Sequence, residues 1–148
     1  MEIERKFLLN TIPTDLYDYP CHTIEQGYLC TNPVVRIRKE DDTYYLTYKG
    51  KGKMAREEYN LPLTAESYAH LREKIDGRLI TKVRYLVPIH DDFTAEVDVF
   101  SSPQPGLHLA EVEFTSIEAA NAFVPPEWFG EDVTEDGRYH NSFMSGLK

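Results

Sequence analysis

Charged and β-branched residues alternate along much of the chain with a period of two. Five times, a charged residue, an Ile or Val and a second charge of the same sign follow one another: Glu2-Ile3-Glu4, Arg36-Ile37-Arg38, Lys82-Val83-Arg84, Glu96-Val97-Asp98 and Glu111-Val112-Glu113. Because residues i and i+2 of a strand share a face, each triplet points two like charges one way and an apolar side chain the other. Neighbouring like charges repel, so the pattern predicts strands whose charged faces meet ligands of opposite charge.

The alternation predicts eight strands, and most are joined by short turns that favour antiparallel neighbours. They span residues 2–9, 23–30, 34–39, 44–49, 54–61, 79–90, 93–100 and 107–114. Apolar residues at helical spacing predict a helix that begins at Thr64, one at 117–123 and a weak one at 134–147. The predicted fold is α+β: an eight-stranded antiparallel β-barrel with a charged interior, an apolar outside and two to four flanking helices.

Length and net charge limit the classes of protein to which this chain can belong. A chain of 148 residues fits one domain, 1–148, and a net charge of −9 argues against a protein that coats nucleic acid. No segment is long and apolar enough to span a membrane, and the charged N-terminus is unlike a signal peptide. Cys21 and Cys30 have no zinc-binding spacing and suit a reduced cytoplasmic setting.

The inward face of the predicted barrel carries as many bases as acids. The bases are Lys6, Arg36, Arg38, Lys49, Arg56, Lys82 and Arg84, and the acids are Glu2, Glu4, Glu58, Glu96, Asp98, Glu111 and Glu113. Burying so many charges is costly unless they are paired or bind ligands. Arg binds phosphate with two parallel hydrogen bonds, and clustered carboxylates are the hard ligands that Mg²⁺ or Mn²⁺ needs. The sequence therefore predicts a metal-dependent binder of a polyanion.

The order of these residues also resembles a known family. Glu2-Ile3-Glu4-Arg5-Lys6 is an ExExK signature, and it is followed by Gln26-Gly27-Tyr28-Leu29, Val35-Arg36-Ile37-Arg38, Tyr45-Leu46-Thr47-Tyr48-Lys49-Gly50, Arg56-Glu57-Glu58-Tyr59 and Thr81-Lys82-Val83-Arg84-Tyr85. Glu96-Val97-Asp98 and Ala110-Glu111-Val112-Glu113 complete the set. Over nearly its whole length the chain resembles the CYTH superfamily, the triphosphate tunnel metalloenzymes.

The resemblance implies roles for the charged residues. Metal ligands would be Glu2, Glu4, Asp98, Glu111 and Glu113, and phosphate ligands would be Lys6, Arg36, Arg38, Lys49, Arg56, Lys82 and Arg84. Glu58 and Glu96 would support the site. From its alternation with Gln26, Tyr28 is expected to face the tunnel near Lys6, where Lys6 helps to orient water, or else Tyr28 simply packs. Lys6, Tyr28, Glu58 and Glu96 are the predicted catalytic side chains. A basic residue of the C-terminal segment, Arg138 or His140, is a further candidate for the tunnel.

The resemblance further implies hydrolysis of inorganic triphosphate to pyrophosphate and phosphate, with Mg²⁺ or Mn²⁺. A class IV-type adenylate cyclase, a triphosphatase acting on ATP or thiamine triphosphate, and a non-catalytic polyphosphate-binding module remain alternatives. A homodimer is also an expectation of the family. Gly50-Lys51-Gly52-Lys53 superficially resembles a phosphate loop, but its spacing and the lack of a following helix favour a hairpin turn.

Overall fold

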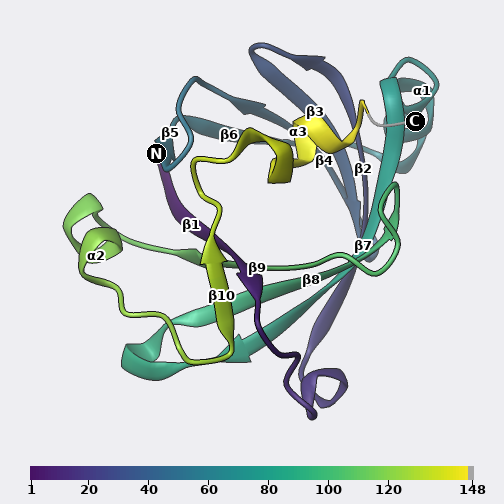
Figure 1. The fold of residues 1–148 in the computed structure, drawn as a ribbon. Coiled ribbons are helices and arrows are strands. Elements are labelled where there is room, and N and C mark those ends of the chain that lie inside the picture. The colour runs from purple at the N-terminus through teal and green to yellow at the C-terminus, as the bar shows by residue number, and fades with distance from the viewer. Residues whose placement is uncertain (147–148) are drawn as a thin grey trace.

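The computed structural model describes residues 1–146 and shows a nearly closed antiparallel barrel (Figure 1). Its strands are β1 (Glu2–Leu9), β2 (Cys21–Thr31), β3 (Val34–Glu40), β4 (Thr43–Lys49), β5 (Ala55–Arg56), β6 (Glu58–Pro62), β7 (Asp76–Pro88), β8 (Thr94–Ser102), β9 (His108–Glu113) and β10 (Phe129–Asp132). Hydrogen bonding places nine of them in the order β10-β1-β9-β8-β7-β2-β3-β4-β6, and β5 pairs with β1. The predicted barrel is confirmed.

The number of strands exceeds the predicted eight for two reasons. The strand predicted at 54–61 is divided at Glu57 into β5 and β6, which pair with different neighbours, β1 and β4. The four-residue β10 was missed, because Phe129-Gly130-Glu131-Asp132 is too short to show an alternating pattern. The division at Glu57 closes the barrel, since β6 extends the sheet beyond β4 and β5 returns it to β1.

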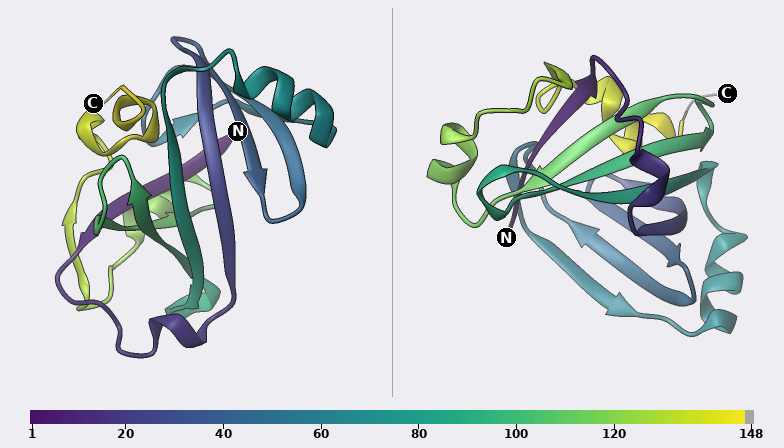
Figure 2. Two further views of the ribbon diagram at one scale, coloured as in Figure 1. Left: turned by 90° about the vertical axis from the view of Figure 1, so that its right-hand side faces the viewer. Right: turned by 90° about the horizontal axis from the view of Figure 1, so that it is seen from below.

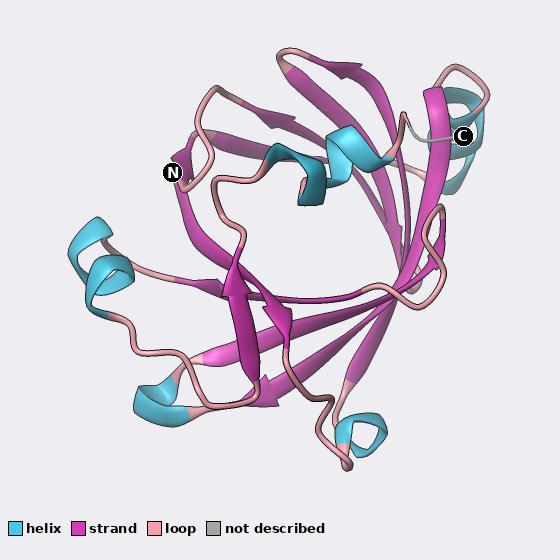
Figure 3. Cartoon of the chain, in the orientation of Figure 1, coloured by secondary structure: helices cyan, strands magenta, loops and turns pink. Residues whose placement is uncertain are grey.

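The helices are short and lie at the edges of the barrel (Figure 3). They are α1 (Ala65–Arg72), α2 (Ile117–Ala122) and α3 (Asn141–Met144). Thr64 caps α1, because its side chain accepts a hydrogen bond of 3.0 Å from the Ser67 amide. The weak helix predicted at 134–147 is only the single turn of α3 and a 3₁₀ turn at Gly137–Tyr139, and Leu147 lies outside the described residues. No helix among residues 1–146 is long and apolar enough to cross a membrane.

Three of the apolar triplet residues, Ile3, Val97 and Val112, belong to the main core or pack against it, on the outside of the barrel. Phe7 of β1 and Val112 of β9 are buried there, on the opposite side of their strands from Lys6 and Glu111. Phe7 packs on Phe129 with ring centroids 4.9 Å apart. The core therefore lies outside the barrel, under α2, β10 and the loops, and leaves the interior to the charged residues.

A second apolar cluster closes one end of the barrel interior. Ile80, Phe100 and Leu109 lie on the inner faces of β7, β8 and β9, near the ends of these strands, and pack with Val133 and Met144 of the C-terminal segment. α3 consequently lies across this end of the barrel, as Figure 1 shows, and the left-hand view of Figure 2 shows the long strands β2 and β7 side by side.

The outer core gives a stability prediction. Phe7→Ala should lower the free energy of unfolding by about 3–5 kcal/mol, because it removes a fully buried ring and leaves a cavity. Phe143→Ala is the matched control: its ring is 50% exposed, so the change should stay within about 0.5 kcal/mol. Urea denaturation measures both, and equal losses in the two variants would contradict this account of the core.

Candidate functional site

The barrel interior contains a cavity of about 230 Å³, far larger than the roughly 10–15 Å³ that one water needs. Side chains of both charges line it, from β1, β3, β4, β5, β6, β7, β8 and β9. The acids are Glu2, Glu4, Glu40, Glu58, Glu96, Glu111 and Glu113, and the bases are Lys6, Arg36, Arg38, Lys49, Arg56, Arg84 and His140. Val34 is the single aliphatic side chain in the lining among the described residues. The cavity is therefore suited to a small, highly charged ligand.

Three carboxylates gather on one wall. Glu2 and Glu4 follow one another on the inner face of β1, and the register of the sheet places Glu113 of β9 opposite Glu4. One oxygen from each of the three lies within 4.8 Å of the others. Such a group of hard oxygen donors can hold a divalent cation.

The pKa values of Glu2 and Glu4 show that these carboxylates lack a compensating positive charge. Burial, and then the negative charge of Glu111, raise the pKa of Glu4 well above its ordinary value. Burial also raises the pKa of Glu2. A carboxylate with a raised pKa is short of positive charge, and a divalent cation between Glu2, Glu4 and Glu113 would supply that charge.

A layer of ion pairs lies beneath the cavity. Asp98 of β8 accepts hydrogen bonds of 2.8 and 2.9 Å from the Arg84 guanidinium, and its carboxylate is 2.8 Å from Lys82 Nζ. Burial alone would raise the pKa of Asp98, but the charges of Arg84 and Lys82 lower it. Lys82 and Asp98 are almost completely buried and are absent from the cavity lining among the described residues. The structure thus places Asp98 with these two bases and not with Glu2, Glu4 and Glu113.

Glu111 connects this layer to the cavity. Its carboxylate lies 3.3 Å from Lys6 Nζ and 3.6 Å from Arg84 Nη2. Burial opposes ionisation, but the charges of Lys6 and Arg84 hold the pKa of Glu111 well below its ordinary value. Lys6 also donates a 3.0 Å hydrogen bond to the Tyr139 carbonyl of the C-terminal segment. Glu111 lines the cavity, but as the ionised partner of two cations.

Two arginines, Arg36 and Arg56, line the cavity without an acidic partner within ion-pair distance among residues 1–146. Arg36 donates 3.1 Å to the Thr47 hydroxyl, yet its buried Nε has no hydrogen-bond acceptor among the described residues, and the same holds for Arg56 Nε. Burial and the neighbouring Arg38 lower the pKa of Arg36. A buried guanidinium with an unused donor is costly, and an anion such as phosphate would satisfy it.

The remaining predicted cations have partners. Lys49 Nζ lies 2.9 Å from Glu2 and 3.3 Å from Glu58, which joins the two sides of the barrel where β5 and β6 close it. Arg38 Nε donates 2.8 Å to the Gln26 amide oxygen. Gln26 is fully buried, and although its alternation with Tyr28 marks the inner face, no role for it was predicted.

The predicted catalytic side chains lie in different surroundings. Burial raises the pKa of Glu96 to about 7, although Arg84 Nη1 is only 3.3 Å away. Burial would raise the pKa of Glu58 too, but its hydrogen bond with Glu2 and the charge of Lys49 lower it to about 2. Tyr28 lines the cavity and is 3.5 Å from the Gln26 amide nitrogen, with no hydrogen bond to Lys6 among the described residues.

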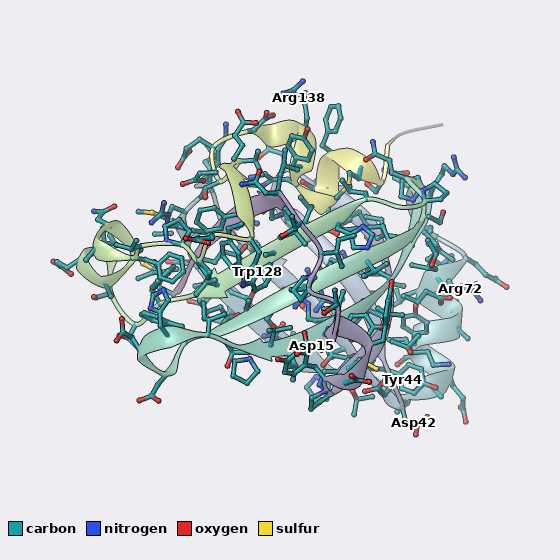
Figure 4. All side chains as sticks on the ribbon, turned by 60° about the horizontal axis from the view of Figure 1, so that its bottom comes forward. Asp15, Asp42, Tyr44, Arg72, Trp128 and Arg138 are labelled. Carbon is teal, nitrogen blue, oxygen red and sulfur yellow. The ribbon has the colours of Figure 1, made fainter. Side chains whose placement is uncertain are left out.

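Of the two basic residues of the C-terminal segment that were candidates for the tunnel, only one lines the cavity. His140 lines the cavity, whereas Arg138 pairs with Asp136 at 2.6 Å and points away from the barrel (Figure 4). Asn141 also reaches the site, since its amide oxygen accepts a 3.1 Å hydrogen bond from Lys82. No sequence signal marked Asn141, because it lies outside the alternating strands.

Comparisons with known proteins agree with this geometry. The model of the CYTH domain family matches residues 1–122. An inorganic triphosphatase of Nitrosomonas europaea is 40% identical over 97% of this chain and 96% of its own length. An inorganic triphosphatase of Acetivibrio thermocellus is 34% identical over 95% of this chain and 90% of its own. A crystal structure of an inorganic triphosphatase is 37% identical, with a TM-score of 0.74, and covers 100% of this chain and 96% of its own.

The carboxylate wall gives a prediction for the metal-free protein. Glu4→Gln should raise the melting temperature in chelator by about 2–5 °C, because it removes a buried carboxylate that is short of positive charge. The sign follows from linkage: unfolded Glu4 loses its proton near pH 4–5, while folded Glu4 keeps it, so wild-type stability falls as the pH rises. The advantage of the variant should therefore be absent below about pH 4 and grow above it.

The control is Glu127→Gln, at an exposed position, which should change the melting temperature by less than about 1 °C at every pH. A melting temperature of Glu4→Gln below that of the wild type at pH 7 in chelator would show that Glu4 is not short of positive charge.

Proposed function

Because the chain belongs to the CYTH family, we propose that it is a metal-dependent hydrolase that cleaves inorganic triphosphate to pyrophosphate and phosphate. The relatives named inorganic triphosphatases match the chain over nearly its whole length, which supports the same reaction here. The observation that carries the proposal is the cavity itself, in which Arg36 and Arg56, whose buried Nε atoms have no acceptor among the described residues, share one small space with the carboxylates Glu2, Glu4 and Glu113.

The lining of the cavity favours an inorganic substrate over a nucleotide. Val34 is its single aliphatic residue among those described, and Tyr28 and Tyr45 are its aromatic ones. Tyr28 is only 3% exposed, and the Tyr45 hydroxyl donates a 3.2 Å hydrogen bond to the Glu40 carboxylate. Binding sites for organic ligands are usually lined by apolar and aromatic side chains. This cavity offers little such surface to a purine, a thiazole or a ribose.

The donor set of the carboxylate wall fits Mg²⁺ or Mn²⁺. Both cations prefer carboxylate oxygens, and Mg²⁺ takes one or two of them together with waters and substrate phosphate. Glu2, Glu4 and Glu113 would hold the cation, while Glu111 and Asp98 keep their bonds to the basic side chains. When bound, the cation neutralises phosphate charge and makes a coordinated water more acidic.

The chain's own side chains would position the phosphates. Arg36 and Lys49 line the cavity from the paired strands β3 and β4, Arg56 and Lys6 line it from the paired strands β5 and β1, and Arg84 lines it from β7. In the reaction, the oxygen of a water attacks the terminal phosphorus, the bond from that phosphorus to the bridging oxygen breaks, and the electron pair leaves on pyrophosphate. Phosphoryl transfer needs mainly positioning and charge neutralisation, which these cations provide.

Glu96 is the side chain best suited to accept the proton of the attacking water. Its pKa of about 7 keeps it partly ionised at neutral pH, which is where a general base works best. Glu58, with its pKa of about 2, serves instead as a permanent negative partner of Lys49. Lys82 and Asp98 act from below the cavity, where they fix the orientation of Arg84.

Substitution of an unpartnered arginine tests the site. Arg56→Gln should lower kcat/KM for inorganic triphosphate about 100-fold or more, because preorganised donors to developing charge are commonly worth that much. Arg78→Gln, at an exposed position of β7, removes the same charge and should leave the rate within about twofold. Phosphate release in Mg²⁺ measures both, and near-normal turnover in Arg56→Gln would refute its assignment as a phosphate ligand.

Removal of the metal tests the reaction class. Phosphate release from inorganic triphosphate should stop in chelator and return on addition of Mg²⁺ or Mn²⁺, since no cation at Glu2, Glu4 and Glu113 would then neutralise phosphate charge or make a coordinated water more acidic. ATP and thiamine triphosphate are the comparison substrates. Cyclic AMP formed from ATP would identify a cyclase, and tight triphosphate binding without release under any metal would identify a binding module.

A further inference from the structure

Three side chains form one row across the inner faces of β3, β4 and β6. The sheet register places Thr47 of β4 directly opposite Arg36 of β3 on one side and Asn60 of β6 on the other. Directly opposite residues of antiparallel strands are close enough for their side chains to bond. Arg36 and Asn60 both line the cavity, and Thr47, which is fully buried, lies between them in the sheet.

The hydrogen bonds along this row all run in one direction. Arg36 Nη2 donates a hydrogen bond of 3.1 Å to the Thr47 hydroxyl, which donates one of 2.6 Å to the side-chain oxygen of Asn60. The Asn60 amide nitrogen donates a hydrogen bond of 3.2 Å to the Glu58 carboxylate, which lies 3.3 Å from Lys49 Nζ. A guanidinium only donates and an ionised carboxylate only accepts, so the two ends of the row fix the orientation of the hydroxyl and the amide between them.

The partner of Arg36 in this row carries no charge. Arg84, another arginine of the cavity, lies opposite Asp98, which neutralises the guanidinium as well as holding it. Thr47 lies directly opposite Arg36 in the same way and holds its guanidinium without neutralising it. A buried cation without a counter-ion is costly, and an anionic ligand would supply the missing charge. The neutral partner therefore keeps Arg36 in place and leaves its charge for a ligand.

We propose that Thr47 and Asn60 are positioning residues of this site, which orient the Arg36 guanidinium through neutral hydrogen bonds and leave its charge for a phosphate of the triphosphate. The inference rests on the proposed function, in which Arg36 is a phosphate ligand. A guanidinium that is already oriented needs no rearrangement when the substrate binds, so its contact with phosphate is worth more. Because both residues act through Arg36, their effects should depend on its presence.

Removal of the Thr47 hydroxyl tests the proposal on the full chain in Mg²⁺. Thr47→Val keeps the branched shape and should lower kcat/KM for inorganic triphosphate about 10-fold or more, since hydrogen bonds to charged groups are commonly worth that factor. Thr47→Ser keeps the hydroxyl and should restore most of the rate. Thr81→Val is the matched control and should leave the rate unchanged, because Thr81 of β7 is absent from the cavity lining among the described residues.

A double-mutant cycle with Arg36 distinguishes positioning from a general structural role. In an Arg36→Met background, Thr47→Val should have no further effect, because the side chain that it orients is gone. Asn60→Ala, at an exposed position of β6, should lower kcat/KM about 3-fold in the wild-type background and should also have no effect in Arg36→Met. Equal losses from Thr47→Val in the two backgrounds, or an unchanged rate in Thr47→Val, would overturn the proposal.

Binding measurements separate this inference from the proposed function. Calorimetric titration of imidotriphosphate, whose bridging nitrogens resist hydrolysis, does not depend on turnover. Thr47→Val should weaken its binding in the wild-type background and leave it unchanged in Arg36→Met. That result without phosphate release from triphosphate would refute hydrolysis and keep the positioning role, whereas phosphate release with equal losses of affinity in both backgrounds would refute the positioning role alone.

Discussion

The cost of burying like charges on the inner face of a barrel governs this structure. Each strand that turns two like charges inward needs opposite charges from another strand, and the sheet register supplies many of them. Lys82 and Arg84 of β7 meet Asp98 of β8, Lys6 of β1 meets Glu111 of β9, and Lys49 of β4 meets Glu2 across the closing seam. Ile3, Val97 and Val112, which lie between the charges, contribute to a core on the outside of the barrel.

The functional site lies where this compensation is incomplete. Glu4 has a strongly raised pKa, and the buried Nε atoms of Arg36 and Arg56 have no acceptor within the part of the chain that the structure describes. Carboxylates that are short of positive charge and guanidinium groups with unused donors, in one cavity, stabilise a divalent cation and a polyphosphate together better than either alone. The same imbalance reduces the stability of the unliganded protein, as is common where a site is preorganised for its ligand.

Period-two alternation predicted most of the fold, because the inward and outward faces of a strand follow directly from its sequence. It correctly placed Lys6 and Phe7 on opposite faces of β1, and Glu111 and Val112 on opposite faces of β9. It failed where pairing between distant strands determines the structure. The strand predicted at 54–61 is interrupted at Glu57, which closes the barrel, and the four-residue β10 pairs with β1 without any alternating pattern. Alternation predicted which charged residues point into the barrel, but not whether each one lines the cavity or lies beneath it. Asp98 shares a face with Glu96, yet the register with β7 places it under Arg84 and out of the cavity.

The central claim is that the carboxylate wall holds a divalent cation while the unpartnered arginines hold the phosphates. Anomalous diffraction from crystals grown with Mn²⁺ and triphosphate tests it most directly. The Glu96→Gln variant should be crystallised, because slow hydrolysis would leave the bound triphosphate intact. The account predicts an Mn²⁺ peak in contact with Glu2, Glu4 and Glu113, and phosphate oxygens within hydrogen-bond distance of Arg36 and Arg56. A cation at Asp98, or a triphosphate bound outside the barrel, would contradict it.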